Sequence, residues 1–144
     1  MRADGEAVAR LAEDWLGTPY LHQASARGRG TDCLGLVRGL YRQLHGAEPL
    51  PVPPYSAAWH GEGEPLLEAA RAALLPAEVP ATGDVLLFRM TPDAPARHCG
   101  VLTAPDRFVH AYSGRAVTAA RFGRYWQARL AGAYSFPEVP LWHS

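Results

Sequence analysis

The hydrophobic periodicity of the chain changes at Gly83, and this change limits the folds that the chain can adopt. Before Gly83, apolar residues recur every three to four positions, which is the spacing of amphipathic helices. After Gly83, short runs rich in β-branched and aromatic residues alternate with turn formers. Helices first and strands afterwards predict an α+β domain, with a helix packed on an antiparallel sheet.

Three helices are expected in the first part of the chain. The first is capped by Asp4 and ends at Gly17, and the second begins near Thr31 or Asp32 and ends at Gly46. The third begins at Pro65, which suits a first helical turn. The predicted apolar stripes are Val8, Leu11, Ala12 and Trp15, then Leu36, Val37, Leu40, Tyr41 and Leu44, then Leu66, Leu67, Ala70 and Leu74.

The connections and strands are predicted from Gly, Pro and apolar runs. Residues 20–30 read as a loop, and residues 49–63 hold four prolines and read as an irregular surface segment. Strands are expected at 84–89, 98–103 and 108–112, with weaker candidates at 116–120 and 130–136.

Composition excludes several classes of protein. The chain of 144 residues has a formal net charge of zero, so it carries no electrostatic footprint for nucleic acid or an anionic membrane. Its two cysteines do not make a disulfide framework. No apolar stretch after Met1 resembles a signal peptide, and none is long enough to span a bilayer. We expect one domain over residues 1–144 that does not secrete itself by the usual route.

Cys33 is the candidate nucleophile. It lies in the first turn of the second predicted helix, where unpaired N–H groups and the helix dipole favour a negative charge. That position lowers the pKa of a thiol and raises the fraction of thiolate, which is the reactive form. The alternative is that Cys33 is a small buried hydrophobic residue, the commonest fate of a free cysteine.

A thiolate nucleophile needs an imidazole and a group that orients it. Only two of the six histidines, His98 and His110, fall in predicted strands. His45 and His143 are expected to be solvated and His60 to be exposed, whereas His22 lies in the loop that leads to Cys33. Each strand histidine has the alternative role of a hydrogen-bonded core residue.

The two strand histidines act together only if they share a face of the sheet. Their strands should form a hairpin around residues 104–107. A regular four-residue loop would place the rings on opposite faces, whereas an odd loop or one bulge would place them together. A three-residue loop with Asp106 in the left-handed conformation would meet this condition.

Five short blocks of the sequence, taken together, form a distinctive pattern. They are Gly-Thr-Pro-Tyr at 17–20, Asp-Cys-Leu-Gly-Leu-Val at 32–37, Gly-Asp-Val-Leu-Leu-Phe at 83–88, His-Cys-Gly-Val at 98–101 and Phe-Val-His-Ala at 108–111. The histidines of the last two blocks are 12 residues apart. In content, order and this interval, the blocks resemble the NlpC-type family of papain-like cell-wall peptidases, and most closely a subgroup found in phage tails and gene transfer agents.

The resemblance implies a papain-like fold with Cys33 as nucleophile, His98 as general base and His110 as the group that orients it. It also implies that the Tyr20 hydroxyl lies near the thiol and that Asp32 shapes the site or binds substrate. The implied substrates are peptidoglycan stem peptides, cleaved as amides next to D-amino acids without a cofactor. Implied partners are phage-like tail proteins. We expect synthesis in the bacterial cytoplasm and delivery to the periplasm or cell wall.

The chain departs from the family pattern in three places. Leu21-His22-Gln23 stands where Gly-Gly often follows the tyrosine, and Leu34 stands where serine usually follows the cysteine. A proline-rich and helical insertion occupies about 47–82. We expect Leu34 and the inserted helix to narrow or roof the cleft.

Three other functions remain open from the residues. The fold could serve as an amidase or acyltransferase with the same nucleophile, or as a catalytically silent module that docks a tail tip on the cell wall. A zinc site built from Cys33, His98, Cys99 and His110 uses acceptable ligand types. We expect no metal, because His98 and Cys99 are neighbours on a strand and should point to opposite faces.

Overall fold

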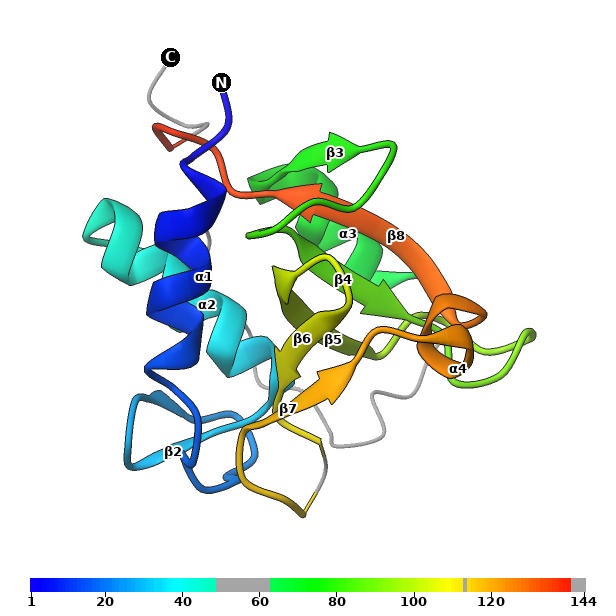
Figure 1. Ribbon diagram of the computed structural model, residues 1–144, viewed down its shortest axis with the longest axis horizontal. Coiled ribbons are helices and arrows are strands. Elements are labelled where there is room, and N and C mark those ends of the chain that lie inside the picture. Colours follow the sequence, from blue (N-terminus) through cyan, green and yellow to red (C-terminus); the bar gives the residue numbers. More distant parts are fainter. Residues whose placement is uncertain (49–62, 113, 141–144) are drawn as a thin grey trace.

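The structure is a computed structural model that describes residues 1–48, 63–112 and 114–140 (Figure 1). The segment predicted to be irregular, except Gly63, and the residues His60 and His143 lie outside this range. The elements in chain order are α1 Gly5–Glu13, β1 Ser25–Ala26, β2 Gly30–Thr31, α2 Cys33–His45, α3 Pro65–Ala73, β3 Leu75–Ala77, β4 Val85–Phe88, β5 His98–Ala104, β6 Arg107–His110, β7 Thr118–Arg121, α4 Arg124–Gln127 and β8 Leu130–Ser135.

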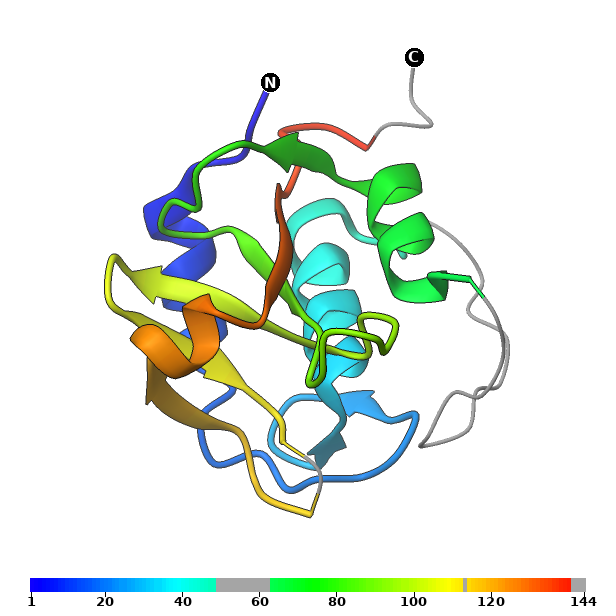
Figure 2. The same ribbon diagram turned by 90° about the vertical axis from the view of Figure 1, so that its right-hand side faces the viewer.

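The centre of the molecule is a six-stranded sheet in the order β3-β8-β4-β5-β6-β7. Every pairing in this sheet is antiparallel. Helices α1 and α2 lie on one side of the sheet and α4 on the other, which Figure 2 shows with the sheet turned toward the viewer. The predicted α+β class, with a helix on an antiparallel sheet, is therefore confirmed.

Helix α2 begins and ends where its terminal residues satisfy the backbone. The Asp32 side chain accepts a hydrogen bond from the Gly35 N–H at 2.7 Å, and Gly46 closes the helix at φ 81°. Positive φ suits glycine, which has no Cβ to clash with the carbonyl. Leu36, Leu40 and Tyr41 are fully buried against the sheet. The predicted bounds and stripe of this helix are confirmed.

The sheet separates two apolar clusters. The larger cluster joins α1, α2 and α3 to the sheet through residues such as Trp15, Leu36 and Val101. The smaller cluster on the other face joins Leu86, Phe88, Leu102, Phe108, Phe122 and Ala133, with Trp126 of α4 packed against it. Because side chains alternate between faces along a strand, β4 and β5 contribute to both clusters.

The hairpin of β5 and β6 meets the condition for the two histidines. Val101 pairs with Val109 and Leu102 with Phe108, but Ala104 pairs with Arg107, so the register shifts by one residue at Thr103. This bulge replaces the three-residue loop, and no residue of the turn has positive φ. The bulge restores the parity that a regular loop would have broken, and His98 and His110 lie on one face.

Some predictions about secondary structure were incomplete. Residues 20–30 contain strand β1, which pairs with β2, and residues 75–77 after the third helix form the edge strand β3. The short helix α4 was not predicted. His45 is not solvated but half-buried, with its ring centroid 4.6 Å from that of Tyr41. Within the described ranges, no helix is long and apolar enough to cross a membrane.

Candidate active site

Cys33 is the first residue of α2 and is partly exposed. A backbone N–H in the first helical turn has no intrahelical carbonyl to bind, so it remains available for an anion. The Cys33 Sγ lies 3.9 Å from the carbonyl oxygen of Arg97, the residue before β5. The helix start and the start of β5 therefore meet at the thiol.

The two strand histidines form a hydrogen-bonded pair. His98 is the first residue of β5 and His110 the last residue of β6, and both are buried. The His98 Nε2 lies 2.7 Å from the His110 Nδ1. His98 also hydrogen-bonds to Cys33. Cys33, His98 and His110 thus form one continuous chain of contacts.

The environment of Cys33 favours the thiolate. A hydrogen bond from Cys99 lowers the pKa of the Cys33 thiol most, followed by the hydrogen bond and positive charge of His98. Burial and the negative charge of Asp32 oppose this change, yet the pKa stays well below its ordinary value. The hydrogen bond with Cys33 raises the pKa of Cys99, and burial and the charge of Cys33 raise it further. These opposite shifts favour a pair in which Cys33 is the thiolate and Cys99 the thiol.

His110 is neutral over the physiological range. Burial, together with the positive charge of His98, lowers the pKa of His110 from 6.5 to about 3. A neutral His110 can accept a hydrogen bond at its Nδ1 from the Nε2 of a protonated His98. The rings of Trp126 and Tyr112 enclose the pair, with Trp126 centred 5.6 Å from His98 and 5.3 Å from His110. Residues Tyr112 and Trp126 were not singled out from the sequence.

Glycine at position 100 leaves room for His110. A Cβ there would lie 2.8 Å from the Phe108 Cδ2 and 3.1 Å from the His110 Cβ. Contacts this short would push β6 away from β5, and the pair of rings would separate. The glycine in the fourth sequence block is therefore explained by close packing.

Asp32 holds the loop before α2 in place. One carboxylate oxygen caps the helix, and the other accepts a hydrogen bond from the Gln23 N–H at 2.7 Å. The His22 Nδ1 lies 3.7 Å from that second oxygen. Gln23 has φ 65°, a conformation in which glycine has less strain. In this chain, Gln23 therefore takes a strained backbone conformation in the segment where the family often has Gly-Gly, and the hydrogen bond to Asp32 holds that backbone.

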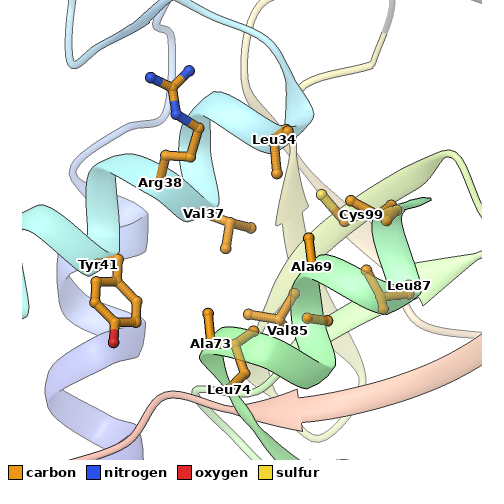
Figure 3. A pocket seen from close by; sticks show the side chains of 12 residues that line it. Leu34, Val37, Arg38, Tyr41, Ala69, Ala73, Leu74, Val85, Leu87 and Cys99 are labelled. Carbon is orange, nitrogen blue, oxygen red and sulfur yellow. The ribbon is translucent and has the colours of Figure 1, made fainter. Parts of the chain in front are cut away.

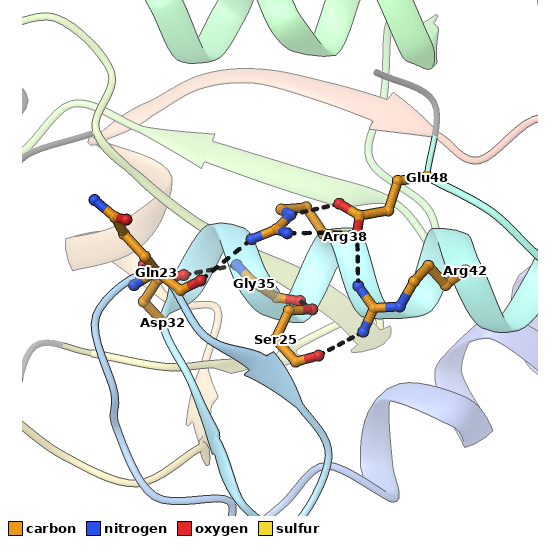
Figure 4. A network of polar contacts seen from close by, with 7 residues as sticks. All are labelled: Gln23, Ser25, Asp32, Gly35, Arg38, Arg42 and Glu48. Atoms are coloured by element: carbon orange, nitrogen blue, oxygen red, sulfur yellow. Dashed lines mark hydrogen bonds and ion pairs between the residues drawn. The ribbon is translucent and has the colours of Figure 1, made fainter. Parts of the chain in front are cut away.

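Two arginines of α2 tie the same loop to the helix (Figure 4). Arg38 and Arg42 both bind the Glu48 carboxylate, at 2.6 Å and 3.2 Å. Arg42 also donates to the carbonyl oxygen of Ser25, and Arg38 donates to that of Gln23. This network keeps the loop packed beside the first turns of α2.

Tyr20 is half-buried and lies close to Cys33 in the fold. Its backbone forms a parallel bridge with Thr31, two residues before the cysteine. The contact of its hydroxyl with the thiol stays a prediction.

The segment before His98 is braced by the start of α3. Glu64 binds Arg89 through one carboxylate oxygen and accepts from the Ala96 N–H at 2.9 Å through the other. Arg89 also donates to the carbonyl oxygen of Ala94. The inserted segment therefore helps to set the position of the strand that carries His98.

Leu34 and the inserted helix share a pocket of about 80 Å³ beside the site (Figure 3). The pocket lies between α2, α3 and β4, and nearly all its walls are apolar. Its lining residues include Leu34, Val37, Ala69, Leu74, Leu87 and Cys99. The two departures from the family pattern are thus neighbours in space, and their effect on the cleft stays a prediction.

The sequence blocks correspond to a known family. Residues 17–135 match the model of the NlpC/P60 family. The chain belongs to this family. Over 135 residues it is 27% identical to a gamma-DL-glutamyl hydrolase of Bacillus subtilis. The aligned region covers 93% of this chain and 30% of that protein. This NlpC/P60 chain therefore spans less than a third of the length of that relative.

Solved NlpC/P60 structures share the fold. NlpC2 from Trichomonas vaginalis matches with a TM-score of 0.63 and 22% identity, over 92% of this chain and 46% of that chain. The NlpC/p60 domain of the peptidoglycan hydrolase SagA matches with a TM-score of 0.61 and 20% identity, over 93% of this chain and 100% of that domain. The predicted papain-like fold of this family is confirmed.

Cys99 is the neighbour of the site that sequence reasoning missed. It was weighed as a zinc ligand and expected to point to the opposite face of the sheet from His98. The opposite faces are confirmed, because Cys99 belongs to the larger apolar cluster and the His98 ring stacks on Phe88 of the smaller one. Both side chains nevertheless hydrogen-bond to Cys33. In the described part of the chain, no three His, Cys, Asp or Glu side chains are arranged to hold a metal ion. The sequence signal that could have identified Cys99 as a neighbour of the site is its position directly after His98.

Proposed function

We propose that this NlpC/P60 chain is a cysteine peptidase that hydrolyses amide bonds in peptidoglycan stem peptides. The observation that carries the proposal is the contact chain from the Cys33 thiolate through His98 to His110, with 2.7 Å between the two rings. A thiolate, a base beside it and a neutral group that orients the base are the parts that covalent acyl transfer requires.

In the proposed reaction, the Cys33 thiolate attacks the amide carbonyl and forms a thioester. Protonated His98 donates its proton to the leaving amine, and His98 then activates the water that hydrolyses the thioester. His110, held neutral by its low pKa, orients His98 through the bond at Nε2. The Cys33 backbone N–H stabilises the developing oxyanion. Tyr20 and Asp32 are proposed to bind or orient the substrate.

The relatives support the choice of substrate. SagA is named as a peptidoglycan hydrolase, and the Bacillus subtilis relative as a gamma-DL-glutamyl hydrolase. On the basis of these two names, we propose that this chain cleaves amide bonds next to D-amino acids. The likeness covers less than a third of that Bacillus protein. The choice of bond therefore does not rest on the activity of the whole Bacillus protein.

Mass spectrometry of purified muropeptides tests the substrate class. The wild-type protein is expected to split stem peptides at a bond beside a D-residue, whereas Cys33→Ala leaves the same muropeptides intact and keeps a wild-type circular dichroism spectrum. Release of the whole stem from the glycan would identify an amidase instead. Intact muropeptides with both proteins would contradict turnover and favour a silent wall-binding module.

The resemblance of the sequence blocks also leads us to propose a setting. The chain would act within a phage-type tail or gene transfer agent and reach the periplasm or cell wall with that particle. Purified particles from the source cells would then contain this chain in a constant ratio to the tail proteins, and its absence from them would contradict the setting.

A further inference from the structure

Cys99 is a second thiol beside the nucleophile, and the proposed hydrolysis does not consume it. Its side chain is 1% exposed, and its Sγ lies 3.3 Å from the carbonyl oxygen of Cys33. The two side chains also hydrogen-bond to each other. In Figure 3 the sulfur of Cys99 points toward Leu34, the residue that follows Cys33.

We propose that Cys33 and Cys99 form a modification site for hydroperoxides, whose product is an intramolecular disulfide that reversibly removes the nucleophile. The two residues are 66 positions apart in the chain but lie on α2 and β5, which pack together. A disulfide places its sulfurs about 2 Å apart, and two side chains already in contact can close to that distance by side-chain rotation.

Access decides which sulfur reacts first. Cys33 is partly exposed, whereas Cys99 is buried under α2. Peroxides react with thiolates that solvent reaches, which selects Cys33. Cys99 then serves as the resolving thiol, because it is already in contact with the sulfur that becomes oxidised.

The two steps balance. The Cys33 thiolate attacks one peroxide oxygen, an S–O bond forms and the O–O bond breaks, and the departing hydroxide takes a proton to become water. Cys33 is then a sulfenic acid. The Cys99 sulfur attacks it, an S–S bond forms and the S–O bond breaks, and the second hydroxide leaves with the Cys99 proton as water. The peroxide gains two electrons, and each sulfur loses one.

The first step also activates the second. The hydrogen bond and negative charge of Cys33 raise the pKa of Cys99 and keep it protonated. Conversion of the Cys33 thiolate to a neutral sulfenic acid removes that charge, so Cys99 loses its proton more readily. Reaction with Cys99 then competes with further oxidation of Cys33 to the irreversible sulfinic acid.

Intact-mass spectrometry after treatment with a few equivalents of hydrogen peroxide tests the proposal. The folded wild type is expected to lose the mass of two hydrogen atoms, and a peptide map should join Cys33 to Cys99. Dithiothreitol should restore both the mass and the hydrolytic rate. The loss of hydrolysis rests on the proposed function, but the mass change needs no turnover and is read separately.

Variants and an unfolded control keep the outcome decisive. Cys99→Ala should gain one or two oxygen atoms at Cys33, and Cys33→Ala should stay unmodified because Cys99 is buried. The wild type in urea should form the disulfide at least about tenfold more slowly, since the fold no longer holds the sulfurs together. A folded wild type that gains oxygen without losing hydrogen, or does not react, would overturn the proposal.

Discussion

At the scale of single residues, the proposed nucleophile Cys33 depends on a neighbour outside the three residues of the proposed catalytic unit. The hydrogen bond from Cys99 is the largest single cause that lowers the pKa of Cys33. A hydrogen bond to an ionised group stabilises the charged form of that group. Cys99 is thus expected to be a positioning residue for the thiolate.

Replacement of Cys99 should therefore shift the titration of Cys33. In Cys99→Ala the midpoint of the alkylation rate against pH is expected to rise, because the hydrogen bond that lowers the pKa of Cys33 is lost. Cys99→Ser keeps a donor and should lie close to the wild type. The rate of iodoacetamide labelling, measured across pH with circular dichroism as a check on folding, gives both midpoints. Equal midpoints for Ala and wild type would show that Cys99 does not set the reactivity of Cys33.

The sequence allowed the three candidate residues to be singled out better than it predicted their surroundings. Cys33, His98 and His110 could be singled out because residue type, helix position and block order agree. Cys99 could not, because alternation along a strand suggests that neighbours diverge. His98 is the first residue of β5, at the end of the ladder with Phe88, so both neighbours can reach the helix start. Trp126 gave no signal, since α4 is too short for a periodic pattern.

At the scale of elements, the site depends on three junctions. The cap of α2 places Cys33, the bulge at Thr103 brings the histidines to one face, and Glu64 braces the segment before β5. The cap and the need for a bulge follow from local sequence. The Glu64 contacts join residues 25 and 32 positions apart, which no local pattern encodes. The role of the insertion could therefore be learned only from the structure.

At the scale of the whole molecule, burial of the neutral His110 links stability to pH. The pKa of His110 falls from its ordinary value of 6.5, expected in the unfolded chain, to about 3 in the folded protein. Between these values the unfolded chain binds a proton that the folded chain does not bind. Stability should therefore fall as the pH drops through this window and stay constant with respect to His110 above it.

Urea unfolding of wild type and His110→Asn across pH 3 to 7 measures this link. The variant lacks the titrating ring, so the difference in unfolding free energy, wild type minus variant, should decrease as the pH falls below about 6.5. Its slope cannot exceed about 1.4 kcal/mol per pH unit for one proton. A difference that stays flat across the window would mean that His110 titrates alike in both states.

The central claim is that Cys33, His98 and His110 act as one hydrolytic unit, and the rate of cleavage of one defined stem peptide by four proteins tests it most directly. Cys33→Ala and His98→Ala are expected to lose at least about 10³-fold in kcat/KM, because each removes a group that takes part in bond formation. His110→Ala should fall less far and keep measurable turnover, since His98 remains. Hydrolysis by Cys33→Ala at a rate close to that of the wild type would contradict the account.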